Sequence, residues 1–162
     1  MADLIITSAD LNERNEYVGD ASNVDGSIII EAGLGTVRFK GRVRARLSVT
    51  AKAGSGIKTG SGIEAGWGID AGWGIDAGSG IEAGSGIKAG DGIKAGDGIE
   101  AGDGIEAGLS ITAKWVGARF RIFAGICLWK LPDPGEDEIR AELRGGIIAF
   151  GKHVPPAPGE AL

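Results

Sequence analysis

Histidine and cysteine, two residues that often carry acid–base or nucleophilic catalysis, are scarce in this sequence of 162 residues. His153 is the only histidine and Cys127 the only cysteine. His153 lies beside a proline-rich tail, which favours an exposed side chain. Cys127 lies in an apolar run, where cysteine usually serves as a small buried hydrophobic residue. The chain has no P-loop pattern and no CxxC pair. We therefore expect no catalytic residues, no metal site and no cofactor, and a protein that is not an enzyme.

Three aspartates are the remaining candidates for a cation site, because carboxylates are preferred ligands of calcium. Asp91, Asp97 and Asp103 each stand in the same Ala-Gly-Asp-Gly-Ile context. The calcium-binding repeat, however, is nine residues long and spaces its ligands differently. In a coil of eighteen residues the three aspartates fall on three different corners, so we expect no shared ion.

A six-residue repeat, Ile-x-Ala-Gly-x-Gly, fills the middle of the chain. Ile and Ala, two residues apart, point to the same side of an extended strand, and the charged residue between them points out. Gly-x-Gly supplies a corner, because glycine accepts positive φ and close backbone approach. A helix is excluded by its period of 3.6 residues and by the cost of two glycines in six. The sequence predicts an all-β, single-domain β-solenoid. Its isoleucines are Ile57, Ile63, Ile69, Ile75, Ile81, Ile87, Ile93, Ile99, Ile105 and Ile111.

The number of residues per coil decides which charges stack. Eighteen residues give a triangular prism, which we favour, with about three coils of repeat; twelve give a flatter solenoid with mixed charges. In the prism Glu64, Glu82 and Glu100 form one acidic column. The other two columns mix signs: Lys58, Asp76 and Lys94 in one, Asp70, Lys88 and Glu106 in the other.

Both sides of the repeat are expected to be antiparallel β-strands that cap it. Residues 36–52 alternate between apolar and basic side chains, and the apolar set is Val37, Phe39, Val43, Ala45, Leu47 and Val49. Residues 118–130 and 138–151 read as further strands, joined by a turn at 132–135. Six aromatic residues are candidates for the main core: Phe39, Trp115, Phe120, Phe123, Trp129 and Phe150. The expected segments are 1–35 (N-terminal), 36–53 (basic strands), 54–113 (solenoid), 114–151 (C-terminal strands) and 152–162 (loose tail).

Five outward residues are the candidates for binding a partner. Trp67 and Trp73 replace Ser or Asp at the outward position of a glycine corner, and aromatic anchors are favoured at interfaces. The alternative is that a flanking segment folds over both rings. Glu64, Glu82 and Glu100 are the second group, because like charges opposed in a ladder destabilise it. Such a column is either tolerated through solvation or kept for a partner.

The net charge of −5 is distributed unevenly. Residues 1–35 carry −6, 36–53 carry +6, 54–113 carry −6 and 114–162 carry +1. Either another molecule reads a charged face or the segments neutralise one another. The basic segment lacks base-stacking aromatic residues apart from one phenylalanine, so direct nucleic-acid binding is not expected. No signal peptide, membrane span or disulfide is expected, which favours a soluble cytoplasmic protein.

Residues 54–151 resemble a group of Gly-Ile-Glu-Ala-Gly repeat proteins of bacteria and their phages. These carry a similar RIFAG segment, here Arg121 to Gly125, followed by a tryptophan, here Trp129. The repeat is also similar to left-handed hexapeptide β-helices, although those place their large and small residues differently. The first resemblance implies a mobile-element context and transfers no site residues.

This context leads to a hypothesis about function. Small acidic proteins of mobile elements often act by occupying a host protein. The leading hypothesis is therefore a protein-binding phage inhibitor of a bacterial defence complex, of anti-CRISPR type. Its partner would be a host protein or a protein–nucleic-acid complex in the bacterial cytoplasm, with no membrane involved and a homodimer left open. The rival hypotheses are a self-assembling structural solenoid and a relative of sugar O- or N-acyltransferases, which need a histidine base.

Overall fold

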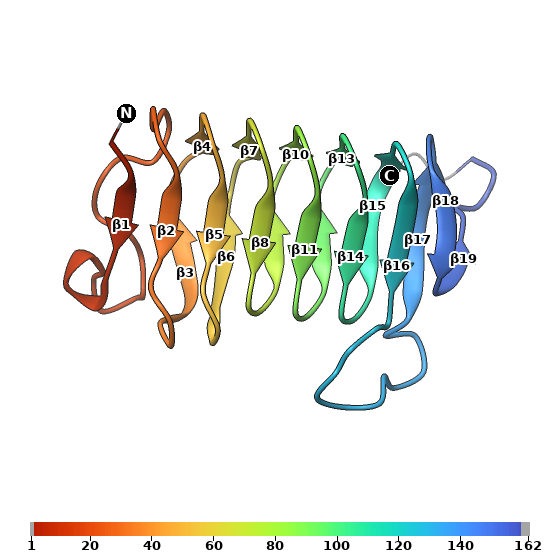
Figure 1. The fold of residues 1–162 in the computed structure, drawn as a ribbon. Coiled ribbons are helices and arrows are strands. Elements are labelled where there is room, and N and C mark those ends of the chain that lie inside the picture. Colours follow the sequence, from red (N-terminus) through yellow and green to blue (C-terminus); the bar gives the residue numbers. More distant parts are fainter. Residues whose placement is uncertain (1, 160–162) are drawn as a thin grey trace.

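The computed structural model describes residues 2–159, over which the chain winds into a three-sided β-solenoid (Figure 1). Every ladder between the named strands is parallel, and each strand away from the two ends pairs with the strands one turn before and one turn after it. The only helix among the described residues is the short 3-10 helix η1 (Ser8–Asp10), and it is not long and apolar enough to cross a membrane.

The strands form three faces, which we call A, B and C in the order in which the chain meets them. Face A consists of β1 (Leu4–Ile6), β2 (Ile28–Ile30), β5 (Val49–Ala51), β8 (Ile69–Ala71), β11 (Ile87–Ala89), β14 (Ile105–Ala107), β16 (Arg121–Ala124) and β18 (Ile147–Phe150). Face B consists of β3 (Gly35–Phe39), β6 (Ser55–Thr59), β9 (Ile75–Ala77), β12 (Ile93–Ala95), the first parts of β15 (Ile111–Ala118) and β17 (Glu138–Leu143), and β19 (Lys152–Val154). Face C consists of β4 (Val43–Ala45), β7 (Ile63–Ala65), β10 (Ile81–Ala83), β13 (Gly98–Ala101) and the last parts of β15 and β17.

The register of the repeat gives eighteen residues per turn. On face C, Ile81 pairs with Ile63 on one side and with Ile99 on the other, and the other two faces keep the same spacing. The triangular arrangement predicted from the sequence is confirmed. A flat coil of twelve residues would place Ile75 beside Ile63, and these two residues lie on different faces.

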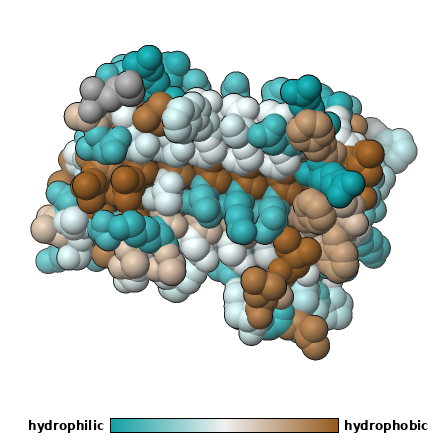
Figure 2. Space-filling view, viewed as in Figure 1, coloured by the Kyte–Doolittle hydropathy of each residue, from teal (hydrophilic) through white to brown (hydrophobic). Residues whose placement is uncertain are grey.

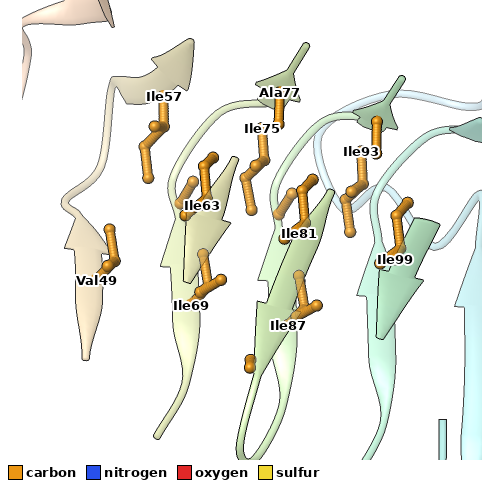
Figure 3. Close-up of a cluster of buried hydrophobic side chains, with 14 of the residues drawn as sticks. Val49, Ile57, Ile63, Ile69, Ile75, Ala77, Ile81, Ile87, Ile93 and Ile99 are labelled. Atoms are coloured by element: carbon orange, nitrogen blue, oxygen red, sulfur yellow. The ribbon is translucent and has the colours of Figure 1, made fainter. Parts of the chain in front are cut away.

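The interior of the prism is filled by columns of isoleucine and alanine (Figure 3). None of the ten repeat isoleucines exposes more than 2% of its surface. Burial of one such side chain contributes about 1.5–3 kcal/mol. The charged residue between each Ile and Ala points outward, as the two-residue alternation of a strand requires. The constant Ile and Ala residues of the repeat thus stabilise the interior, whereas the residues that vary between hexads face solvent.

The glycine corners are tight for a reason that differs in part from the prediction. None of the repeat glycines from Gly60 to Gly108 has positive φ; such glycines lie only outside this stretch, for example Gly54 and Gly125. Instead, the first glycine of most corners packs against the turn before it. A Cβ on Gly84 would overlap the carbonyl oxygen of Gly66, and a Cβ on Gly102 would overlap that of Gly84. Close approach of stacked backbones therefore requires these glycines.

The flanks continue the solenoid, and here the prediction of antiparallel caps and about three coils is wrong. Face A alone has eight parallel strands and hence seven successive turns. Val49 pairs with Ile69, and Ile105 pairs with Ile122, so the spacing changes while the pairing persists. Leu47, predicted to face inward, stands at a corner and is only half-buried.

The C-terminal flank contains one long insertion. Residues 125–137 form a loop, so the strand predicted over 118–130 ends at Ala124, before Gly125 with φ of 80°. A turn closes this loop, with the amide of Glu136 donating to the Asp133 carbonyl. The expected loose tail begins with strand β19, and residues 160–162 lie outside the described part of the chain.

The aromatic residues of the flanks do not form the main core, which corrects a further prediction. Of the six candidates only Phe39 is buried, where Tyr17 packs on it at 5.8 Å between ring centroids. Trp115 and Phe123 are half-buried, and the remaining three are exposed: Phe120, Trp129 and Phe150. The isoleucine columns extend into the flanks and leave no room inside for larger rings.

Candidate binding surface

Face C carries the acidic column that the sequence predicted. Glu64, Glu82 and Glu100 occupy matching positions on β7, β10 and β13. Adjacent rungs of a sheet lie about 4.8 Å apart, so these carboxylates stack closely. Glu64 is neutralised by ion pairs with Arg42 and Arg44. Within residues 2–159, Glu82 and Glu100 have no ion-pair partner.

The corresponding columns on the other two faces alternate in sign. On face A, Lys88 stands between two carboxylates and pairs with Glu106 at 3.1 Å. On face B, Asp76 stands between two lysines and pairs with Lys58 at 2.7 Å. Cross-strand pairs of opposite charge stabilise a sheet and like pairs destabilise it. Face C is therefore the one face of the repeat that keeps unfavourable charge.

A shallow groove of about 380 Å³ follows this acidic column. Arg42 lines one end and Trp115 the other. The Trp115 ring lies over Gly98, where a Cβ would overlap it, and the Arg144 guanidinium stacks on the ring at 4.9 Å. We did not predict this tryptophan as part of a surface. The feature of the sequence that could have indicated it is the corner within β15, which has no glycine. At this corner the Trp115 ring turns onto face C.

Trp67 and Trp73 are both exposed, at 60% and 44%, but they stand on different corners. Trp67 occupies the corner between faces C and A, directly after β7 and its Glu64. Trp73 occupies the corner between faces A and B, where its ring lies beside Gly35, 3.8 Å from the point that a Cβ on this glycine would occupy. The structure thus places Trp67 at one edge of face C, although this residue does not line the groove, and Trp73 one corner farther along the chain.

The three aspartates of the Ala-Gly-Asp-Gly-Ile steps lie on three corners, in agreement with the sequence analysis. Asp103 lies on the corner of Trp67 and Asp91 on that of Trp73, since their backbone hydrogen bonds run along these corners. Asp97 lies on the third corner and pairs with Lys114 at 2.8 Å. In the described part of the chain no three metal-ligating side chains form a cluster.

The N-terminal segment neutralises half of the basic side chains in residues 36–53. Ion pairs join Arg46 to Asp25 and Lys52 to Glu31, and Lys40 lies 3.8 Å from Glu16. The first two segments therefore neutralise one another in part. Arg42 and Arg44 of the basic segment pair instead with Glu64 of the repeat.

Burial changes the acidity of two carboxyls on the outside of the repeat. It raises the pKa of Asp70 on face A, an effect that Lys88 opposes. It also raises the pKa of Asp91, where the nearby Lys130 acts in the opposite direction. Lys130 belongs to the loop 125–137, so this loop folds back toward the corner that carries Asp91.

The same loop exposes a group of apolar side chains that the sequence analysis did not single out as a surface. Leu128 and Leu131 are almost fully exposed, and Trp129 is exposed with Lys130 over its ring at 5.6 Å. In Figure 1 the loop between β16 and β17 extends below the body of the molecule, and Figure 2 shows hydrophobic residues on this part of the surface. We did not predict this exposure because we interpreted residues 118–130 as a strand, in which alternate apolar side chains are expected to point into the core.

His153 and Cys127, the only histidine and the only cysteine of the sequence, stand apart from the acidic groove. His153 is exposed on β19, and its Nε2 lies 2.9 Å from the carbonyl oxygen of Ala141. Cys127 is half-buried in the loop rather than buried in a strand, which corrects the expectation of a core residue. Neither residue lines the groove on face C.

Comparison of the chain with protein-family models, with curated proteins and with solved structures finds no match.

Proposed function

We propose that the protein is a non-catalytic binding protein that presents face C to a basic surface of another protein. The observation that carries the proposal is the pair Glu82 and Glu100, stacked without a cation while faces A and B alternate in sign. Because Glu82 and Glu100 point outward, a lysine at either position would leave the packing of the interior unchanged. Local rules that are broken without structural gain often mark a functional surface.

The partner that fits this face is a host protein, or a protein–nucleic-acid complex, with exposed lysines and arginines. The acidic face is consistent with an anti-CRISPR type of inhibitor. Such a protein would inhibit a bacterial defence complex by covering one of its basic surfaces. Two solvated carboxylates act mainly on the rate of association and on its salt dependence. A nearby aromatic residue would supply affinity, and Trp67 has the position and the exposure for it.

A pull-down from bacterial lysate with matched charge variants tests this proposal. Glu82→Gln with Glu100→Gln removes two carboxylates from face C and should reduce recovery of the partner and flatten its salt dependence. Asp70→Asn with Glu106→Gln removes two carboxylates from face A and serves as the control. Equal loss in both variants would show that net charge, rather than face C, governs binding.

Trp67→Ala tests the aromatic contribution. Because the ring is exposed, its removal should leave the melting temperature unchanged while affinity falls more than about tenfold. Trp73→Ala, on the neighbouring corner, should have a smaller effect on affinity. A lower melting temperature with intact binding would mean that the Trp67 ring is structural.

A further inference from the structure

The two ends of the solenoid are covered differently. At the N-terminal end Ile6 is fully buried, and the segment between β1 and β2 extends beyond β1 (Figure 1). In that segment Leu11 packs against the core and bridges to Tyr17. At the C-terminal end the inward positions of the last turn are Leu143 and Ile148, which are only half-buried, and His153, which is exposed. A further segment thus covers the interior only at the N-terminal end, although β1, like β18, pairs with a single strand among the described residues.

The last turn also offers unpaired strand edges. Among residues 2–159, β18 pairs only with β16, and β19 pairs only with β17. The chain beyond β19 does not add another turn. Pro155 and Pro156 line a cavity together with Ala95 and Gly96, so this part of the tail runs back along the side of the prism. An open edge with free amide and carbonyl groups is a template for another strand.

The rim of this end is apolar on face A. Ile147 and Phe150 point outward from β18 and are 69% and 53% exposed. Phe123 lies one turn earlier at the position that pairs with Phe150. The middle of face A is charged, and Figure 2 shows hydrophobic residues gathering near its C-terminal end. Unpaired backbone and exposed apolar side chains thus meet at one place.

We propose that this end docks onto the same end of a second copy of the chain, about a two-fold axis through face A. The rotation reverses strand direction, so β18 meets β18 of the second copy as an antiparallel neighbour. Ile147 of each copy then packs against Phe150 of the other, which is the self-complementarity that a two-fold interface requires.

The same rotation brings face B of one copy onto face C of the other, so the edge of β19 in one copy meets the edge of the last part of β17 in the other. Because the segment between β1 and β2 covers the N-terminal end, assembly stops at two copies instead of forming a filament.

The mass in solution tests the interface, measured by analytical ultracentrifugation at increasing protein concentration. The wild-type chain should reach twice the mass of one chain. Ile147→Glu with Phe150→Glu should remain at the mass of one chain, with an unchanged circular dichroism spectrum because both side chains are exposed. Ile5→Glu, an equally exposed apolar position on β1 at the other end of face A, is the matched control and should still dimerise.

A wild-type chain that stays single, or one that grows beyond two copies, would overturn the proposal. So would a dimer that survives Ile147→Glu with Phe150→Glu, or one that Ile5→Glu abolishes. Hydrogen exchange gives a second reading without any substitution, since the amides of β18 should gain protection as the dimer forms. The interface is independent of the acidic column on face C, so either proposal can fail alone.

Discussion

Between Ile57 and Ile111 the chain returns an isoleucine to the interior every six residues, whereas the C-terminal flank does so irregularly. Val116 follows Ile111 after five residues, Ile122 follows after six more, and Ile139 only after the loop 125–137. All of these positions nevertheless stack in register on the repeat. The difference shows that parallel pairing and an apolar residue at each inward position define this prism. Corners absorb deletions and insertions.

The largest contrast between the two regions is expected at inward positions. Ile81→Asp places an unpaired charge in the closed interior and should cost at least about 4 kcal/mol, enough to unfold the protein. Ile148→Asp lies on the half-open last turn and should cost about 1–2 kcal/mol. Denaturant unfolding of both variants measures this difference. Equal losses would mean that the last turn is as closed as the repeat.

The six-residue period made the solenoid predictable in the repeat. The flanks lack this period, so their place in the same solenoid was not predicted. A six-residue recurrence together with strand alternation determines which side chains point inward, whereas the three faces and the column of Glu82 also require the eighteen-residue register that the structure shows. The same inward pairs exist before the repeat, as in Val43 with Ala45 and Val49 with Ala51, six residues apart. We interpreted their alternation as an antiparallel pair, because alternation alone does not distinguish neighbours in a hairpin from neighbours in a coil.

Other features of the structure were not predicted, because they depend on contacts between residues far apart in the sequence. The exposure of Phe150 follows from its place on the last turn, and the position of Trp115 follows from a corner shortened by one residue. The acidic column and the mixed charges of the other two columns were predicted, but the ion pairs that neutralise Glu64 were not. The pairing of Arg42 with Glu64 requires the twenty-residue spacing of that turn.

Corner glycines should give the next largest effect. Gly84→Ala forces a Cβ against the carbonyl oxygen of Gly66, and overpacking of this kind typically costs about 1–3 kcal/mol. Gly60→Ala is the matched control, because a Cβ there meets nothing within 4 Å. Thermal unfolding should show a clear loss for the first variant and little change for the second. Similar losses would indicate that backbone conformation, rather than stacking, selects glycine.

In the C-terminal flank a smaller and pH-dependent effect is expected at Glu138. Hydrogen bonds from Arg140 and then from Lys152 lower the pKa of this carboxyl. A lowered folded-state pKa contributes stability above the unfolded value of about 4.3 and loses it as pH falls through the folded value. Glu138→Gln should therefore be less stable than wild type at neutral pH, with the difference disappearing in acid.

The control for that experiment is Glu142→Gln, an exposed carboxyl paired with Arg144 at 3.3 Å. Its effect on the melting temperature should be small at every pH, because exposed ion pairs contribute little. A pH-dependent loss of the same size in both variants would assign the effect to net charge instead of the cluster around Glu138.

The smallest effect on stability is expected on the outside of the repeat, and its sign is the informative part. Glu82→Lys gives face C the alternating column that the other faces already have, which should stabilise the fold by about 0.2–1 kcal/mol. Lys88→Glu makes the opposite change on face A and should destabilise it by a similar amount. If Glu82→Lys raises the melting temperature and abolishes partner binding, the acidic column costs stability that only function explains. If instead the melting temperature falls, the Glu82 carboxylate stabilises the fold, and the argument that face C is the binding surface is wrong.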